Sequence, residues 1–247
     1  MIRQDLYFTS PYLNAAGTLG FRPPARWPLP EVQGAFITNP ISQGPRTPAA
    51  ERAALPFPGG FLLHSGLPNP GLSRVLRHHA QRWAQSALPV WVHLLAEDPA
   101  ATAQMVRRLE GLEGVMAVEI GLPTHASPEE CLEIVQAAAG ELPLSVCVPV
   151  TQAREAWVAR LPEAGAAGIT LAPPRGTLIR EQKPVSGRLY GSALLPQAVA
   201  AVQALRKSGL TLLAACGILS RADADMLLAA GASAVQLDVV LWRGWAD

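Results

Sequence analysis

The sequence lacks three features that would direct it to a membrane or to nucleic acid. No apolar run among its 247 residues is long enough to cross a bilayer. No run of lysine and arginine occurs and the net charge is +1, so nothing indicates binding to nucleic acid or to an anionic membrane. The polar start, Met1–Asp5, does not have the form of a signal peptide. We therefore expect a cytoplasmic protein with neither a nucleic-acid nor a membrane partner.

Cysteine is also scarce. The three cysteines, Cys131, Cys147 and Cys216, lie far apart, each inside an apolar stretch and without Cys-x-x-Cys spacing. This pattern predicts buried thiols in a reducing compartment rather than a disulfide framework or a zinc site. Cys147 could alternatively be a nucleophile, but the sequence around it offers no partner base.

What the sequence does contain is a repeated alternation of short apolar runs and helical patterns. The runs are apolar at both odd and even positions, which is typical of parallel strands covered on both faces. The predicted strands are Tyr12–Ala15, Ala35–Thr38, Pro89–Leu95, Met116–Ile120, Leu144–Val148, Ala167–Leu171, Thr211–Ala215 and Ala234–Leu237. Helix starts follow at Asp98-Pro99, Ser127-Pro128-Glu129-Glu130 and Ser220-Arg221-Ala222-Asp223. Eight such units predict a single α/β domain over residues 1–247, a (β/α)8 TIM barrel.

Two segments of this predicted barrel are irregular. Phe21–Gln33 contains four prolines, so the first crossover cannot be a regular helix. After the last strand only Val239–Asp247 remains, which is too short for a full closing helix. Its Trp242 and Trp245 could share one face and cap the barrel, or they could dock on a second chain, in a homo-oligomer or with a protein partner.

Three motifs carry a resemblance to a known family. They are Ala16-Gly17-Thr18-Leu19-Gly20, the phrase Gly66-Leu67-Pro68-Asn69-Pro70-Gly71, and Gly187-Arg188-Leu189-Tyr190-Gly191-Ser192-Ala193-Leu194-Leu195-Pro196. Together they resemble dihydroorotate dehydrogenases, and the resemblance covers nearly the whole chain. The third motif is similar to a Gly-Gly-Leu-Ser-Gly-Pro-Ala signature of that family. The resemblance implies an FMN-dependent oxidoreductase barrel of pyrimidine biosynthesis, with a small-molecule site at the carboxyl ends of the strands.

The resemblance also implies which positions meet FMN and substrate. The cofactor positions are Ala16, Gly17, Thr18, Asn39, Cys147, Gly191, Cys216, Gly217 and Asp238, and the substrate positions are His64, Asn69 and Arg175. Several of these depart from the family pattern. Two flavin-contacting lysines are replaced by Asn39 and Cys147, and Ala172-Pro173-Pro174 stands in place of a substrate-binding Asn-Thr.

The phosphate positions depart further. The family binds the FMN phosphate through backbone N–H groups of Gly-Gly and Gly-Thr pairs, and this chain has Cys216-Gly217 and Asp238-Val239 there. A carboxylate about 4 Å from a phosphate charge costs roughly 4 kcal/mol at an effective dielectric near 20. The alternative role for Asp238 is the N-cap of a short final turn.

The catalytic base that the resemblance implies is absent as well. The family carries Cys or Ser in the loop after strand four, whereas Gly121–His125 contains neither. The remaining candidates are His64, His93 and His125. Two histidines and two carboxylates at one barrel mouth could hold a metal, but no local ligand motif exists, so we predict no metal site and satisfied polar residues in a smaller pocket.

Two functions remain open at this point. The first is a remodelled homologue, a pseudoenzyme that has lost the base, the lysines and the phosphate glycines, binds FMN weakly or not at all, and binds a ligand or a partner. The second is an active FMN-dependent oxidoreductase that oxidises dihydroorotate or a related small molecule.

Overall fold

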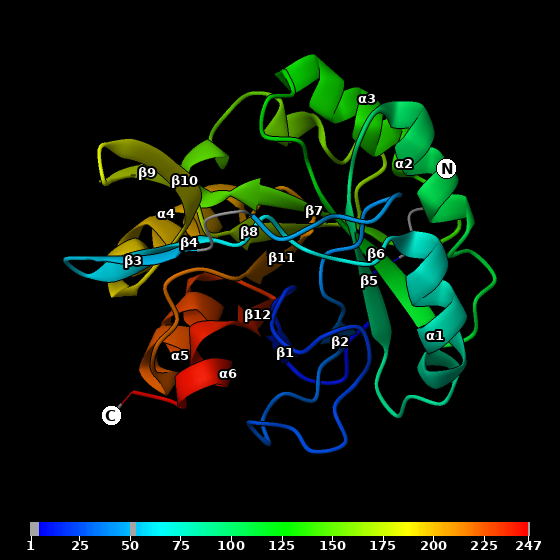
Figure 1. Ribbon diagram of the computed structural model, residues 1–247, viewed down its shortest axis with the longest axis horizontal. Coiled ribbons are helices and arrows are strands. Elements are labelled where there is room, and N and C mark those ends of the chain that lie inside the picture. The colour runs from blue at the N-terminus through cyan, green and yellow to red at the C-terminus, as the bar shows by residue number, and fades with distance from the viewer. Residues whose placement is uncertain (1–4, 50–52, 247) are drawn as a thin grey trace.

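A computed structural model describes residues 5–49 and 53–246 (Figure 1). Its core is an eight-stranded parallel sheet with the neighbour order β1-β12-β11-β8-β7-β6-β5-β2. The strands are β1 (Tyr12–Asn14), β2 (Phe36–Ile37), β5 (Val90–Leu95), β6 (Val115–Gly121), β7 (Leu144–Pro149), β8 (Gly168–Ala172), β11 (Thr211–Ala214) and β12 (Ala234–Leu237). Each lies within one residue of a predicted strand, so the predicted barrel is confirmed.

The barrel is closed between β1 and β2 by a side chain. The Asn14 Oδ1 atom accepts a hydrogen bond from the Ile37 N–H at 2.9 Å, and its Nδ2 group donates to the Ile37 carbonyl at 2.7 Å. Two backbone bonds, from Gly34 N–H to the Tyr12 carbonyl and from Thr9 N–H to the Gly34 carbonyl, support this seam. The fully buried amide thus replaces the strand ladder where both strands are very short.

Helices cover the outside of the barrel. They are α1 (Leu72–Ala84), α2 (Pro99–Arg107), α3 (Pro128–Ala138), α4 (Leu195–Leu205), α5 (Arg221–Ala230) and the short α6 (Val239–Arg243). The three predicted helix starts are confirmed, because Asp98 accepts from Ala101 N–H, and Ser127 and Ser220 form capping boxes. The crossover between β7 and β8 contains only two 3-10 turns, η1 (Val150–Gln152) and η2 (Val158–Arg160).

Both irregular segments of the barrel behave as the sequence predicts. Residues 15–35 contain no helix, and the carbonyl of Phe21 accepts a hydrogen bond from the Trp83 indole, which ties this crossover to α1. The final helix has only five residues. Asp247 and Met1–Gln4 lie outside the described residues, so the prediction of one domain over 1–247 stays a prediction.

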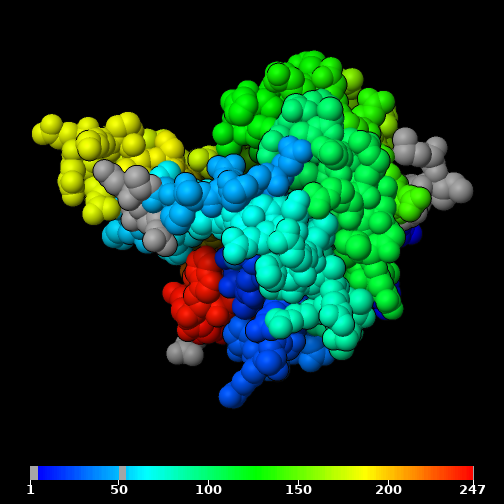
Figure 2. Space-filling model, turned by 45° about the vertical axis from the view of Figure 1, so that its right-hand side comes forward, coloured from blue at the N-terminus to red at the C-terminus, as the bar shows by residue number. Residues whose placement is uncertain are grey.

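A second sheet, which the sequence did not predict, lies at the carboxyl ends of the barrel strands. Its antiparallel strands are β3 (Ala53–Phe57), β4 (Gly60–His64), β10 (Lys183–Tyr190) and β9 (Arg175–Arg180), in that order. Figures 1 and 2 show its β9–β10 hairpin, in yellow, projecting from the body of the barrel. The sheet combines two of the family-like motifs, because β4 leads into the Gly66–Gly71 phrase and β10 begins the Gly187–Pro196 segment.

The described part of the chain agrees with two expectations from composition. All three cysteines are buried and free, as the thiol prediction requires. None of the helices described has the length and apolar character that a membrane crossing needs.

Candidate functional site

A cavity of about 260 Å³ lies between the barrel mouth and the antiparallel sheet. Its walls come from the loop after β1, from the ends of β5, β6, β7, β8 and β12, and from β4 and β10. A neighbouring cavity of about 340 Å³ shares six wall residues with it: Leu67, Cys147, Ala172, Pro173, Arg175 and Arg188. Together they form one cleft over the carboxyl ends of the strands, where TIM barrels bind their ligands.

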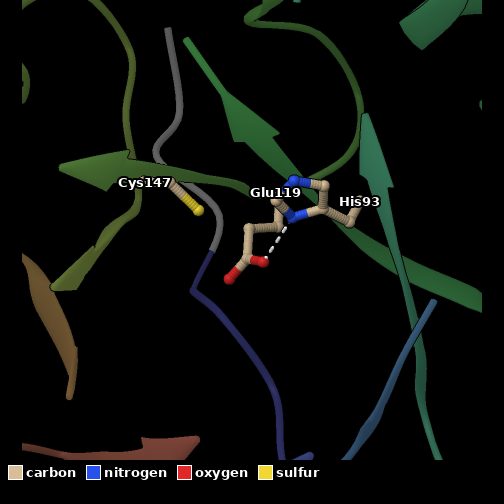
Figure 3. Close-up of side chains that lie close together, drawn as sticks. All are labelled: His93, Glu119 and Cys147. Carbon is tan, nitrogen blue, oxygen red and sulfur yellow. Dashed lines mark hydrogen bonds and ion pairs between the residues drawn. The ribbon is translucent and has the colours of Figure 1, made fainter. Parts of the chain in front are cut away.

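The floor of this cleft is a buried hydrogen-bonded cluster around Glu119 (Figure 3). The His93 Nδ1 atom lies 2.7 Å from Glu119 Oε1. The Thr170 hydroxyl and the Gln236 amide each donate to Oε2 at 2.6 Å. Ser145 extends the cluster with a 3.0 Å contact to Thr170. All five side chains are at most 1% exposed, so both carboxylate oxygens are fully engaged.

These contacts fix the charge state of the cluster. Burial raises the pKa of Glu119, but hydrogen bonds from His93, Thr170 and Gln236 outweigh it and hold the pKa below its ordinary value. An ionised carboxylate only accepts hydrogen bonds, so the proton between the two groups sits on His93 Nδ1. The His93 Nε2 atom is buried and has no hydrogen-bond partner among the described residues.

Cys147 completes a group that could in principle hold a metal. Ligand atoms of His93, Glu119 and Cys147 all lie within 4.8 Å of one another. However, burial and the nearby Glu119 charge raise the pKa of Cys147 well above its ordinary value, which favours the thiol over the metal-binding thiolate. Since Glu119 is already saturated by donors, the cluster has the chemistry of an orienting carboxylate–histidine pair rather than of a metal site.

The loop after β12 departs most from an FMN phosphate site. Asp238 is 6% exposed, and its carboxyl group accepts a hydrogen bond from the backbone N–H of Val239, so it caps α6. Burial raises the pKa of Asp238 to about 7. A backbone N–H group at the position where the resemblance expects a bound phosphate is therefore directed at a side chain of the protein itself. The residues at this position do not fit a phosphate dianion.

An aromatic pair borders the same end of the cavity. The Tyr190 and Trp242 rings lie 6.2 Å apart at 60°, and both side chains line the cavity. Burial raises the pKa of the Tyr190 hydroxyl, which lies close to Arg188 and Asp238. Tyr190 occupies the position of the serine in the family signature. A large ring therefore lies where the family-like motif has a small hydroxyl.

The other predicted cofactor positions divide into two groups. Ala16, Gly17 and Thr18 line the cavity, as do Cys147 and Asp238. Asn39, Gly191, Cys216 and Gly217 are not among the residues that line it. Asn39 accepts a hydrogen bond from Gly20 N–H, and Gly191 and Gly217 have positive φ angles of 145° and 80°. A Cβ at Gly217 would meet the Leu195 backbone at 2.5 Å, so this glycine is required by packing against α4.

Some of the predicted catalytic and substrate residues line the cavity and others do not. His64 and Arg175 line the cavity, and His64 Nδ1 donates to the Ser186 carbonyl at 2.8 Å. His125 is exposed and does not line the cleft described here. Asn69 is buried and its amide bonds Ser42 and nearby backbone groups, so it holds the loop rather than facing the cavity.

Sequence reasoning missed four residues of the site. Ser145, Thr170 and Gln236 are polar residues of otherwise apolar strands; Thr170 and Gln236 direct their side chains to Glu119, and Ser145 contacts Thr170. That interruption of an apolar strand was the available signal. Arg188 lies in the middle of a recognised motif, at a place where the family has glycine, and it lines both parts of the cleft.

Comparisons with known proteins bear on the family resemblance and on the fold. No family model matches the sequence. The chain is 27% identical over 254 residues to the catalytic subunit of dihydroorotate dehydrogenase B (NAD(+)) from Desulforudis audaxviator, covering 93% of this chain and 82% of that protein. It is 28% identical over 266 residues to the subunit of the same name from Latilactobacillus sakei, covering 93% and 83%.

A solved structure supports the fold. The dihydroorotate dehydrogenase of Eimeria tenella, crystallised with ferulenol, superposes with a TM-score of 0.67 at 16% identity, covering 95% of this chain and 79% of that one. At that identity the likeness concerns the barrel alone. With the motifs and the sequence similarity along nearly the whole chain, it supports one conclusion: this protein is a TIM barrel that resembles dihydroorotate dehydrogenases from end to end and diverges from them in sequence.

Proposed function

We propose that this barrel is a ligand-binding homologue, a pseudoenzyme that no longer transfers hydride from dihydroorotate to FMN. The observation that carries the proposal is the buried Asp238 carboxyl group, which accepts the Val239 N–H at the phosphate position. FMN phosphate carries nearly two negative charges, so an ionised Asp238 would repel it. A protonated Asp238 would not repel the phosphate but would still occupy the Val239 N–H that the phosphate would need.

The substitutions around the flavin position support the same proposal. Asn39 and Cys147 carry no positive charge that could stabilise a reduced, anionic flavin. No cysteine or serine is present in Gly121–His125 to remove the substrate proton. These positions are independent of Asp238, and each removes a different part of the dehydrogenase reaction.

The proposal predicts that the purified protein carries no stoichiometric FMN and shows no flavin absorbance at about 450 nm. Added FMN should bind weakly, and Asp238→Gly should tighten binding at pH 8, where the wild-type carboxyl group is mostly ionised. The control is Asp225→Gly, which removes an acid that does not line the cavity and should leave FMN binding unchanged. Asp223 is not suitable as a control because its side chain caps α5. A yellow protein that releases about one FMN per chain would refute the proposal.

An active FMN-dependent oxidoreductase is the second candidate. It is favoured by the similarity to dihydroorotate dehydrogenase B subunits over 93% of this chain and by the glycine-containing loop at Ala16–Gly20, which still lines the cavity. The discriminating measurement is dihydroorotate oxidation with added FMN and an artificial electron acceptor. We expect no turnover above background, and turnover of about 1 s⁻¹ would establish the enzyme instead.

A further inference from the structure

Two arginines face each other across the antiparallel sheet above the cavity. Arg175 of β9 and Arg188 of β10 are direct partners in the strand register. Side chains of directly opposed residues lie on one face of a sheet, with Cβ atoms roughly 5 Å apart. Both arginines line both parts of the cleft, so the pair stands where the two cavities meet.

The position of Arg188 is set by tight packing of its neighbour. A Cβ at Gly187 would meet the Leu63 carbonyl oxygen at 2.3 Å, so β10 can approach β4 this closely only with glycine there. The partner of Gly187 in the register is Gly176, and the next pair is Arg188 with Arg175. Since side chains alternate along a strand, this packing fixes which face receives the two guanidinium groups.

No acidic side chain neutralises this pair. Among the described residues, neither Arg175 nor Arg188 forms an ion pair with a carboxylate. Three carboxyl groups line the two cavities. Glu119 is fully engaged by its own donors, Asp238 caps α6, and Glu155 accepts a hydrogen bond from the Trp157 indole at 2.7 Å. Arg46 lines the same cavity and adds further positive charge.

Such an arrangement is unfavourable unless something else compensates it. Like charges placed directly opposite each other on a sheet destabilise it. The pKa of Arg175 is lowered by partial desolvation and by the charge of Arg188. Arg188 stands where the family-like signature has glycine, and the uncompensated pair calls for a negatively charged partner from outside the chain.

We propose that the cleft binds a small organic anion, with its carboxylate or phosphate group held between Arg175 and Arg188. Guanidinium groups match the geometry of both anions and bind them in a bidentate manner. The cavities of about 260 and 340 Å³ have the size of a small-molecule site rather than of a polymer groove. This inference rests on the proposed ligand-binding function and names the class of ligand.

The test uses succinate and inorganic phosphate as probes, with the neutral succinamide as comparison and sodium chloride to hold ionic strength constant. Binding is followed by thermal shift and by tryptophan fluorescence, because Trp242 lines the cavity. We expect at least one anion to bind wild type and to bind Arg188→Gln and Arg175→Gln roughly tenfold or more weakly. Preference for succinate would indicate an organic acid, and preference for phosphate a phosphate ester.

The matched control is Arg180→Gln, on the same hairpin but away from the cleft and beside Glu181. It should leave anion binding unchanged. Without any anion, Arg188→Gln should raise the melting temperature by about one to a few degrees, since the repulsion is gone. Equal binding of succinamide, or equal losses in Arg180→Gln and Arg188→Gln, would overturn the proposal.

Flavin content distinguishes this proposal from the one it rests on. Absorbance at about 450 nm is recorded on the same preparations. Stoichiometric FMN together with arginine-dependent anion binding would remove the pseudoenzyme proposal and keep the anion site. Absence of FMN together with anion binding that does not depend on the two arginines would keep the pseudoenzyme proposal and remove the anion site.

Discussion

Buried carboxyl groups occur twice at this barrel mouth, and their surroundings give them opposite properties. Glu119 receives three side-chain donors that outweigh the cost of burial, so its pKa falls. Asp238 has no side-chain donor of this kind and is held mainly by the backbone at Val239, so burial dominates and its pKa rises to about 7. The number of donors within reach decides which buried acid is ionised.

The raised pKa of Asp238 predicts a dependence of stability on pH. The unfolded chain releases this proton near pH 4 and the folded chain only near pH 7, so the folded state binds more protons between them. Stability should therefore be greatest below about pH 4 as far as Asp238 is concerned, and fall as pH rises to about 7, by roughly 4 kcal/mol at most. The lowered pKa of Glu119 affects stability only at lower pH, where its stabilising contribution is lost as the carboxylate becomes protonated.

The measurement compares wild type with Asp238→Asn by urea unfolding at several pH values between 4.5 and 8. Asparagine can still accept the Val239 N–H but does not titrate. The difference in unfolding free energy between the two proteins isolates the contribution of Asp238 from that of all other groups. A difference that stays constant across the range would contradict the raised pKa.

The elements of the barrel could be predicted because they follow local rules. Apolar runs gave eight strands to within one residue, and Asp98, Ser127 and Ser220 marked helix starts through their capping side chains. The antiparallel sheet could not be predicted in this way. It joins two local hairpins, β3–β4 and β9–β10, across more than a hundred residues of sequence, since Phe61 of β4 meets Tyr190 of β10, and no local pattern encodes that pairing.

The seam between β1 and β2 was also beyond sequence reasoning, and it supplies a prediction. Replacing Asn14 by leucine of similar size would leave the buried N–H and carbonyl of Ile37 without partners. Each unsatisfied group costs about 1–3 kcal/mol, so we expect Asn14→Leu to lower the unfolding free energy by roughly 2–5 kcal/mol. Urea unfolding measures the loss.

The control for the seam is Gln33→Leu, which removes a single hydrogen bond from an exposed side chain to the Pro30 carbonyl. It should change stability by less than about 0.5 kcal/mol. Equal effects of the two substitutions would mean that the Asn14 amide does not hold the barrel closed.

At the scale of the whole molecule, the barrel and the glycines of the family-like motifs are retained, while several side chains that line the cleft differ from the family pattern. Gly187 and Gly217 persist because a Cβ there would collide with neighbouring backbone. Side chains that point into the cleft have no such constraint, and Arg188, Tyr190 and Asp238 stand there instead of small residues. A fold is therefore easier to recognise from sequence than the chemistry that it carries.

The C-terminal tail gives the last prediction, on assembly. Sequence reasoning allowed Trp242 and Trp245 to share one face, but the structure separates their contacts. Trp245 packs against the core, and the Arg221 guanidinium carbon lies 5.8 Å from the centroid of the Trp245 ring. The Ala246 N–H donates to the Leu219 carbonyl. Trp242 is 48% exposed beside Tyr190, so it is the large apolar side chain that the described part of the tail offers to a second chain.

We expect light scattering to give a mass above one chain for wild type and a mass of one chain for Trp242→Ala, because the exposed indole would be buried between copies. Trp245→Ala serves as the matched substitution. It should lower the melting temperature through lost packing without dissociating the assembly. A monomeric wild type, unaffected in mass by either substitution, would leave the tail as a cap of its own barrel, with Trp242 a wall of the cavity only.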